Sequence, residues 1–431
     1  MRLSVYTYLF ERDSQCYLYN SETGLFSEIR HALYERLFNE DFDSLEDGVK
    51  DHLKKSKIIV EEEKLYDYYY AQKLQFLADI AVKDSLHLTI APTIACNFDC
   101  PYCYEGRKAA TTMSDKVIDK LIAFVRGYEQ LRKLHVMWYG GEPLMAFPVI
   151  KKIVMKIKKE LPDIQFSQSI VTNGYLLSEE VIAFMHEHAF RDIQISLDGT
   201  EEHHNKTRCL KKSGKGTFSI IIENLKKLVE AMPPEFKVSL RINISKDNED
   251  DFAEMYTKLK QMFPHKNVNP YPGYIRVPSR SERRMCYNSF CGKDVYYFQR
   301  RMAQKGIPMP FYPQKQGKGC MVSHNDALLI GPTGDVFKCW DDINDPIMKV
   351  GHIADKSLTN PTLICQYQLE CSAYDDPHCK ECLLFPVCEG GCTRLRYMNK
   401  YMGKHFDVCS YLKDPHILEE CLLSSTKHKT K

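Results

Sequence analysis

Three cysteines close to residue 100 have the type and spacing needed to hold a metal cluster. Cys96, Cys100 and Cys103 follow an alternating apolar run that is typical of a β-strand. Their C-x3-C-x2-C spacing supplies three thiolates, whereas a cubane iron–sulfur cluster has four irons. The pattern therefore predicts one open iron that can bind a small molecule through an amine and a carboxylate. A structural zinc site is the alternative, but it would need a fourth Cys or His close by, and the sequence has none there.

Further motifs fall at or near the ends of the predicted strands that follow. Gly140-Gly141-Glu142-Pro143 ends the second strand, Ser169 lies in the third, Ser196 lies in the fourth, and Arg208 comes ten residues after Asp198. A single motif of this kind is usually only a turn. Together with the aromatic residue after the third cysteine, Tyr104, their joint order resembles the radical S-adenosylmethionine (SAM) superfamily.

This resemblance implies a role for each motif. The three cysteines would bind a [4Fe-4S] cluster, and its open iron would hold SAM. The turn Gly140–Pro143 would receive the SAM amino group, Ser169 and Ser196 would belong to the SAM site, and Arg208 would pair with the SAM carboxylate, a task suited to a guanidinium. One electron would then cleave SAM into methionine and a 5′-deoxyadenosyl radical, which takes a hydrogen atom from the substrate. A non-enzymatic iron–sulfur carrier or scaffold is the rival hypothesis, and it would not need Arg208 or the turn.

A second group of cysteines lies near the end of the chain. Its seven members are Cys320, Cys339, Cys379, Cys382, Cys388, Cys392 and Cys409. Their spacing resembles the SPASM domain of peptide- and protein-modifying radical SAM enzymes. The resemblance implies two auxiliary [4Fe-4S] clusters, an outer one on Cys379, Cys382, Cys388 and Cys409 and an inner one on Cys320, Cys339 and Cys392. A zinc-ribbon-like fold is the alternative, but seven thiolates in this order do not divide into two four-coordinate zinc sites.

The inner cluster lacks an evident fourth ligand. Cys286, Cys291, Cys365 and Cys371 are the candidates, or the fourth iron is open; we favour Cys291 or an open site. Asp341 or Asp342, just after Cys339, could take a proton near the inner cluster, by analogy with an aspartate beside the matching cysteine in sulfatase-maturing enzymes. Their simpler role is to form a turn or a cap.

The elements that must position these residues alternate between strands and helices, which predicts an α/β fold with a parallel sheet. The expected strands are 87–93, 134–139, 164–172, 193–197, 236–244 and 271–277, and the expected helices are 114–128, 148–161, 178–188, 218–232 and 249–263. Six such units would form a partial (β/α)6, TIM-like barrel. The motifs lie toward the carboxyl ends of the strands, where active sites of such sheets are found.

The rest of the chain differs in character from the barrel at 85–278. Residues 1–84 contain short strands (3–10, 15–19, 25–27) followed by three helices (28–38, 45–55, 63–80), an order that resembles a small winged-helix-like domain that recognises leader peptides. A bridging segment at 279–318 leads to the SPASM-like region at 319–415 and a tail at 416–431. The SPASM-like region is rich in cysteine, and we expect it to need metal to fold. A hairpin is predicted around Pro332-Thr333-Gly334.

Composition restricts the function classes. The chain has 431 residues with 59 basic and 57 acidic side chains, so no global field favours nucleic acid or a membrane surface. It shows no signal peptide and no long apolar run, which favours a cytoplasmic protein. In a large chain without an export signal, 17 cysteines are better explained as metal ligands than as disulfides.

The residues before the glycine-rich turn bear on the substrate. Sulfatase maturases typically carry Gln there, whereas this chain has Trp138-Tyr139. This difference and the leader-binding resemblance favour a peptide maturase that installs an oxidative thioether, C–C or C–O crosslink in a ribosomally made precursor peptide. Strand addition to an exposed edge within residues 1–30 could bind the leader. Oxidation of a Cys or Ser to formylglycine in a sulfatase is the alternative. Either reaction needs an electron donor such as flavodoxin or ferredoxin.

Overall fold

The computed structural model describes residues 1–81, 84–103, 111–264, 267–275, 290, 292–310, 313, 320–343, 345–355, 358–388 and 390–427. Tyr104, Cys286 and Cys291 therefore lie outside the described residues. The chain forms two compact units. The barrel unit comprises Val82–Ile307 and Asn325–Ile364, and the second unit comprises Met1–Ala81, Pro308–His324 and Cys365–Lys431.

The barrel unit contains the six predicted parallel strands, arranged in sequence order. They are β6 (Ser85–Thr93), β7 (Lys133–Gly140), β8 (Gln165–Thr172), β9 (Phe190–Leu197), β10 (Lys237–Ile244) and β11 (Val268–Tyr274). Each strand pairs in parallel with its neighbour, which confirms the α/β prediction. β11 begins earlier than predicted. Pro270 and Pro272 weaken the strand signal in the sequence, but β11 is the edge strand of this sheet, and an edge strand tolerates proline.

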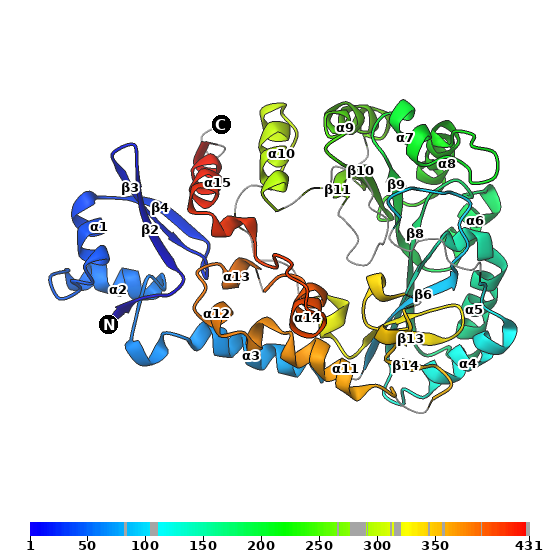
Figure 1. Ribbon diagram of the computed structural model, residues 1–431, viewed down its shortest axis with the longest axis horizontal. Helices are drawn as coiled ribbons and strands as arrows, with labels where there is room; N and C mark the ends of the chain where they lie inside the picture. Colours follow the sequence, from blue (N-terminus) through cyan, green and yellow to red (C-terminus); the bar gives the residue numbers. More distant parts are fainter. Residues whose placement is uncertain are drawn as a thin grey trace. The chain divides into compact units, whose positions relative to one another are not determined.

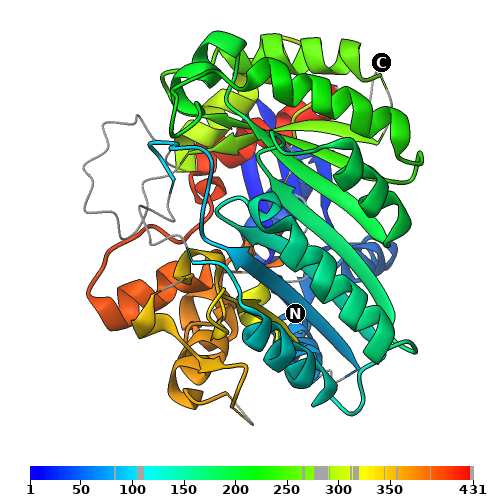
Figure 2. The ribbon, with the colours of Figure 1, turned by 90° about the vertical axis from the view of Figure 1, so that its right-hand side faces the viewer.

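Helices cover the outer face of this sheet, as Figures 1 and 2 show. The five expected helices are present as α4 (Asp115–Arg126), α5 (Phe147–Glu160), α6 (Glu179–Glu187), α8 (Phe218–Ala231) and α9 (Asp251–Met262). Each buries an apolar stripe, for example Ile150, Ile153 and Ile157 of α5. Ser178 caps α6 by accepting a hydrogen bond from the Val181 N–H at 3.3 Å. The barrel unit also contains elements that were not predicted individually. They include the 3-10 turn η2 (Pro143–Ala146), the short polar helix α7 (Glu201–Thr207) and, in the bridging segment, α10 (Gly292–Gln304).

A hairpin from the cysteine-rich part of the sequence extends the barrel sheet. β12 (Ala327–Ile330) pairs in parallel with β6, and β13 (Asp335–Phe337) and β14 (Gly351–His352) follow in antiparallel order. The expected hairpin is present, and Gly334 adopts a φ of 94° at its turn. Short 3-10 turns, η4 (Trp340–Asp342) and η5 (Pro346–Met348), follow. The compact units therefore cut across the predicted segment 319–415, because strand pairing ties residues 325–364 to the barrel.

The second unit begins with strands and helices in the expected order. β1 (Arg2–Leu3) pairs with β5 (Ile59–Val60), and β2 (Thr7–Arg12), β3 (Gln15–Asn20) and β4 (Leu25–Ile29) form an antiparallel sheet. The helices are α1 (His31–Phe38), α2 (Asp47–Lys55) and α3 (Asp67–Ile80), with the 3-10 turn η1 (Glu62–Lys64) before α3. Leu18, Leu37 and Leu53 share one core between this sheet and the first two helices. The winged-helix-like character and leader binding of this segment stay predictions.

The carboxyl-terminal part of the second unit consists of short helical turns. They are η3 (Met321–Ser323), η6 (Gln366–Glu370), η7 (Ala373–Asp375), α12 (Pro377–Lys380), α13 (Phe385–Cys388), α14 (Thr393–Met402), η8 (Tyr411–Lys413) and α15 (Pro415–Lys427). α11 (Pro361–Cys365) ends the barrel-unit segment and reaches the second unit only at Cys365. Phe10 and Tyr19 of the amino-terminal sheet share a core with Val387 and Leu422, so this segment packs on the first eighty residues of its own unit. Within the described part of the chain, every helix is too short or too polar to cross a bilayer.

Candidate active site

The segment with the first three cysteines directly follows β6 and is tied to the ends of other barrel strands. The Asn173 side-chain amide donates to Asn97 Oδ1 at 2.8 Å, and the Lys211 N–H donates to the Asn97 carbonyl at 2.8 Å. Phe98 forms an isolated β-bridge with Leu210. These bonds hold the cysteine segment at the carboxyl-terminal edge of the sheet, as the sequence predicts.

Two of the three thiols are partly enclosed. Cys96 and Cys100 are half-buried, and Cys103 is exposed. Burial raises the pKa of the Cys96 thiol to about 12 and that of the Cys100 thiol to about 11. The metal-free thiols are therefore protonated near neutral pH, and iron binding must displace their protons. The Phe98 N–H already points at Cys96 Sγ at 3.4 Å, as it would toward a thiolate.

The glycine-rich turn packs directly on the segment that leads to Cys96. A Cβ atom on Gly140 would lie 2.4 Å from the Thr93 carbonyl oxygen, and one on Gly141 would lie 2.4 Å from the carbonyl oxygens of Ile94 and Ala95. Gly140 also has a φ of 110°, which L side chains rarely adopt. Both glycines are needed because any side chain would push the turn away from the cysteine segment.

Glu142 has a structural role that the sequence did not reveal. Its carboxylate is fully buried and accepts hydrogen bonds from the Leu144 N–H at 3.0 Å, the Thr172 hydroxyl at 2.7 Å and the Asn173 N–H at 2.7 Å. Burial raises the pKa of Glu142, and these three donors offset part of the effect. Because the chain occupies these acceptor positions, the backbone carbonyls of the turn are better suited than the carboxylate to receive an ammonium group.

Arg208 belongs to a buried polar network around Asp198. Its Nη1 donates to the Tyr102 hydroxyl at 3.0 Å and lies 3.7 Å from Asp198 Oδ1. The Tyr102 hydroxyl contacts both Asp198 carboxylate oxygens at 2.6 and 2.7 Å, and Thr207 and Asn243 donate to the same carboxylate at 2.7 and 3.0 Å. The network joins the cysteine segment, through Tyr102, to β9 and β10.

Two buried donors at this site have no partner within the described residues: Arg208 Nε and Asn97 Nδ2. Buried donors without a partner are rare and cost free energy, so they mark a place where an acceptor is expected. A carboxylate suits the free guanidinium edge. Soft thiolates for iron, a close-packed glycine turn and a buried guanidinium with an unpaired donor therefore fit SAM and its cluster.

The two predicted serines lie on the strands as expected, but they differ in surroundings. Ser169 is buried on β8, and its hydroxyl is 3.0 Å from His135 Nε2, whose Nδ1 is 3.0 Å from the Ser167 hydroxyl. Burial lowers the pKa of His135 to about 4, so this imidazole is neutral near pH 7. Ser196 is half-buried on β9 opposite Arg241 of β10. Their contact with SAM stays a prediction.

An aromatic pair lies beside the glycine-rich turn. Tyr139, the last residue before the turn, has its ring centre 5.1 Å from that of Trp340, which is 37% exposed. Burial raises the pKa of Tyr139, and Asp341, Cys103 and Cys339 raise it further by their negative charge. The barrel unit thus brings Cys339 and the exposed Asp341 near the first cysteine group around one tyrosine.

Four predicted ligands of the outer cluster lie together in the second unit. Burial raises the pKa of Cys382, and the neighbouring Cys388 and Cys409 raise it further. Burial likewise raises the pKa of Cys379 to about 11, with Cys382 among the contributing charges. The Arg396 guanidinium donates to Cys379 Sγ at 3.1 Å and to Asp376 at 2.6 Å. A cationic donor beside a thiolate group is typical of an iron–sulfur site.

The predicted ligands of the inner cluster are divided between the units. Cys320 and Cys392 belong to the second unit and Cys339 to the barrel unit. Among the candidates for the fourth ligand, Cys371 is buried, whereas Cys365 is exposed with its thiol 3.9 Å from Glu370 Oε1. Cys286 and Cys291 lie outside the described residues. The auxiliary clusters and their ligands therefore stay predictions.

Residues 90–259 match the family model of the Radical SAM superfamily. The chain therefore carries a radical SAM domain, which confirms the predicted fold class and cofactor family. It is 24% identical over 352 residues to a cysteine-type anaerobic sulfatase-maturating enzyme of Clostridium novyi (strain NT), which covers 75% of this chain and 92% of the relative. It is also 24% identical over 335 residues to the mycofactocin maturase MftC of Mycolicibacterium smegmatis, covering 72% of this chain and 78% of the relative.

Solved structures share the fold. Native anSMEcpe with bound AdoMet and the Cp18Cys peptide superimposes with a TM-score of 0.61 at 19% identity, covering 80% of this chain and 99% of the other. Streptococcus suis SuiB bound to S-adenosylmethionine gives a TM-score of 0.53 at 14% identity, covering 92% of this chain and 96% of the other. The relatives therefore include a sulfatase-maturating enzyme and a mycofactocin maturase.

Proposed function

We propose that this protein is a radical SAM peptide maturase that installs an oxidative crosslink in a ribosomally made precursor peptide. The observation that carries the peptide class is the extent of the shared fold. The SuiB fold covers 92% of this chain, against 80% for the sulfatase-maturase fold, and each match uses nearly all of the other protein. SuiB has also been solved bound to its precursor peptide SuiA.

The amino-terminal sheet supports a peptide partner. In the order β2-β3-β4, the outer strand β4 has mostly exposed residues. An extended leader peptide could add to this edge through backbone hydrogen bonds, which demand little of its sequence. Leader binding would hold the core peptide at the barrel for the reaction, raising its effective concentration there.

The residues of the barrel divide the remaining tasks. When bound, SAM and the first cluster supply a 5′-deoxyadenosyl radical on reduction, and an auxiliary cluster could accept the second electron of the oxidation. Arg208 would bind the SAM carboxylate through its free Nε, and the backbone carbonyls of the turn at Gly140–Glu142 would accept from the amino group. The Tyr139–Trp340 pair lies beside the glycine-rich turn and would help to keep water from the bound substrate.

A crosslink removes two hydrogens from the peptide. One leaves as a hydrogen atom to the adenosyl radical, the other leaves as a proton, and the remaining electron goes to an oxidant such as an auxiliary cluster. Exposed Asp341 is the proposed proton acceptor, since it lies near Tyr139 and follows Cys339. An external flavodoxin or ferredoxin would supply the electron that cleaves SAM.

Sulfatase maturation is the second candidate, favoured by the match to 92% of the C. novyi relative. Mass spectrometry of reacted peptides separates the two reactions. The anaerobic full-length enzyme is incubated with SAM, dithionite and either the peptide encoded next to its gene or a peptide carrying a sulfatase Cys or Ser motif. Loss of two hydrogens from the precursor peptide supports crosslinking, whereas an aldehyde formed only in the sulfatase peptide would reject our proposal.

A further inference from the structure

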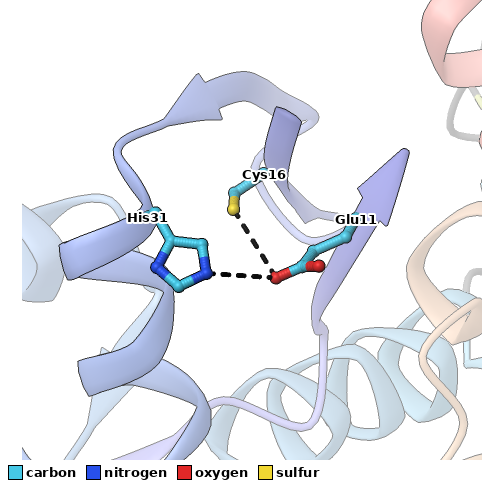
Figure 3. A group of neighbouring side chains, drawn as sticks. All are labelled: Glu11, Cys16 and His31. Atoms are coloured by element: carbon cyan, nitrogen blue, oxygen red, sulfur yellow. Dashed lines mark hydrogen bonds and ion pairs between the residues drawn. The ribbon is translucent and has the colours of Figure 1, made fainter. Parts of the chain in front are cut away.

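The second unit contains a cluster of metal-binding side chains that none of the iron–sulfur sites uses. The ligand atoms of Glu11, Cys16 and His31 all lie within 4.8 Å of one another (Figure 3). Glu11 Oε1 is 3.8 Å from Cys16 Sγ and 3.7 Å from His31 Nε2. Glu35 approaches the same imidazole nitrogen, with its Oε1 3.7 Å away. The cluster thus offers one thiol, one imidazole and two carboxylates.

The backbone fixes the positions of these residues. Asp13 and Ser14 have φ values of 51° and 62°, which is typical of the tight two-residue turns that match strand twist. This turn sets the β2–β3 register and places Glu11 directly opposite Cys16. On the other side Cys16 pairs with Ile29, and His31 begins α1 two residues later. Glu35 lies one turn further along α1, on the same face as His31.

The donor types and spacing suit zinc. Zinc prefers four ligands drawn from thiolate, imidazole and carboxylate groups, and at its usual bond lengths two tetrahedral ligands lie roughly 3.3–3.8 Å apart. The contacts of Glu11 Oε1, at 3.7 and 3.8 Å, fall in this range. Cys16 is only 4% exposed, whereas the side chains of Glu11 and His31 are 50% and 68% exposed. The thiol therefore closes the inner side, and the exposed partners leave a path for the ion.

We propose that Cys16, His31, Glu11 and Glu35 form a zinc site that fastens α1 to the β2–β3 hairpin. Zinc binding would replace the proton of the Cys16 thiol, because the thiolate is the form that ligates the metal. Zinc would stabilise the amino-terminal sheet by linking β2, β3 and α1. The inference does not depend on the proposed peptide reaction.

Zinc content per chain tests the site. The full-length protein with its iron–sulfur clusters is dialysed anaerobically against dilute zinc and then against buffer, and zinc and iron are counted in the wild type and in Cys16→Ser and His31→Ala. His416→Ala is the matched control, because His416 pairs with Glu420 at 3.7 Å with the same i,i+4 spacing as His31 and Glu35. Cys209→Ser controls for loss of a thiol outside the predicted cluster ligands.

We expect one zinc per chain in the wild type and both controls, and its loss in Cys16→Ser and His31→Ala with unchanged iron. Zinc X-ray absorption should show one sulfur neighbour with nitrogen and oxygen neighbours. Equal zinc content in the wild type and His31→Ala, or a shell of sulfur alone, would overturn the proposal, because the zinc would then sit on the cluster cysteines. His31 is exposed, so His31→Ala keeps the test valid even if Cys16→Ser fails to fold.

Discussion

The role that the structure gives to Glu142 can be tested by the substitution Glu142→Gln. The glutamine keeps one oxygen but turns the other into an NH2 group that must face a donor, either the Asn173 N–H or the Leu144 N–H. A buried N–H left without an acceptor costs about 1–3 kcal/mol, and each remaining bond loses the extra strength that a charged acceptor gives. These losses sum to about 3 kcal/mol of unfolding free energy in the barrel unit. The neutral amide avoids the burial cost that raises the pKa of Glu142, so we expect a net loss of about 1–2 kcal/mol.

Denaturant unfolding followed by circular dichroism measures this loss, and equilibrium dialysis measures SAM affinity on protein with matched iron content. The control is Glu180→Gln, which removes a 68% exposed carboxylate paired with Lys151. Such surface pairs contribute about 1 kcal/mol or less. We expect Glu142→Gln to lower stability clearly and the control to change it little. If Glu142→Gln instead unfolds like the wild type but loses SAM affinity about 100-fold, its carboxylate contacts SAM directly and our interpretation is wrong.

Three further predictions concern Arg208, the buried His204 and the proposed proton acceptor Asp341. Arg208→Lys should weaken SAM binding by about 10–100-fold, since lysine cannot replace the guanidinium edge that carries the unpaired Nε; equal affinity, measured by dialysis, would count against the carboxylate assignment. Burial lowers the pKa of His204 from 6.5 to about 3 in the folded protein. As the pH falls, the unfolded chain therefore binds the proton first, and the free energy of unfolding should decrease by about 1.4 kcal/mol between about pH 7.5 and 5.5. Denaturant unfolding at each pH measures this decrease, which should be smaller by about 1.4 kcal/mol in His204→Gln than in the wild type. If stability falls equally with pH in both proteins, the lowered pKa is not that of His204. Asp341→Asn should abolish the peptide product while iron content and 5′-deoxyadenosine formation persist, whereas full product yield in the mass spectrum would remove Asp341 from the mechanism.

Local patterns allowed most of the barrel to be predicted from the sequence. Apolar and polar residues alternate in β6 to β10, and apolar residues recur every three or four positions in α4, α5 and α8. Both patterns follow from which side chains are buried, so they can be recognised in the sequence. α7 was missed because its residues are almost all polar, and β11 was displaced by its prolines. The pairing of β12 with β6 joins residues more than two hundred positions apart, and no local signal encodes it.

The candidate site divides in the same way. The cysteines and the glycine turn could be found because their spacing is contained in short motifs. Tyr102 and Asn243 were not singled out, because their partner Asp198 follows β9, far from both in the sequence, and only the folded sheet brings the three together. The bonds that Glu142 makes to Thr172 and Asn173 were hidden for the same reason. The position of Tyr102 between Cys100 and Cys103 was the one local signal that could have revealed it.

Formation of 5′-deoxyadenosine from SAM is the most direct test of the central claim that Cys96, Cys100 and Cys103 hold a cluster with an open iron. The anaerobic, iron-loaded protein is reduced with dithionite in the presence of SAM, and the nucleoside is counted by chromatography in the wild type and in Cys100→Ala. We predict 5′-deoxyadenosine and methionine in equal amounts from the wild type and none from the variant. A fully iron-loaded wild type that leaves SAM intact, or a variant that cleaves it equally well, would contradict the account.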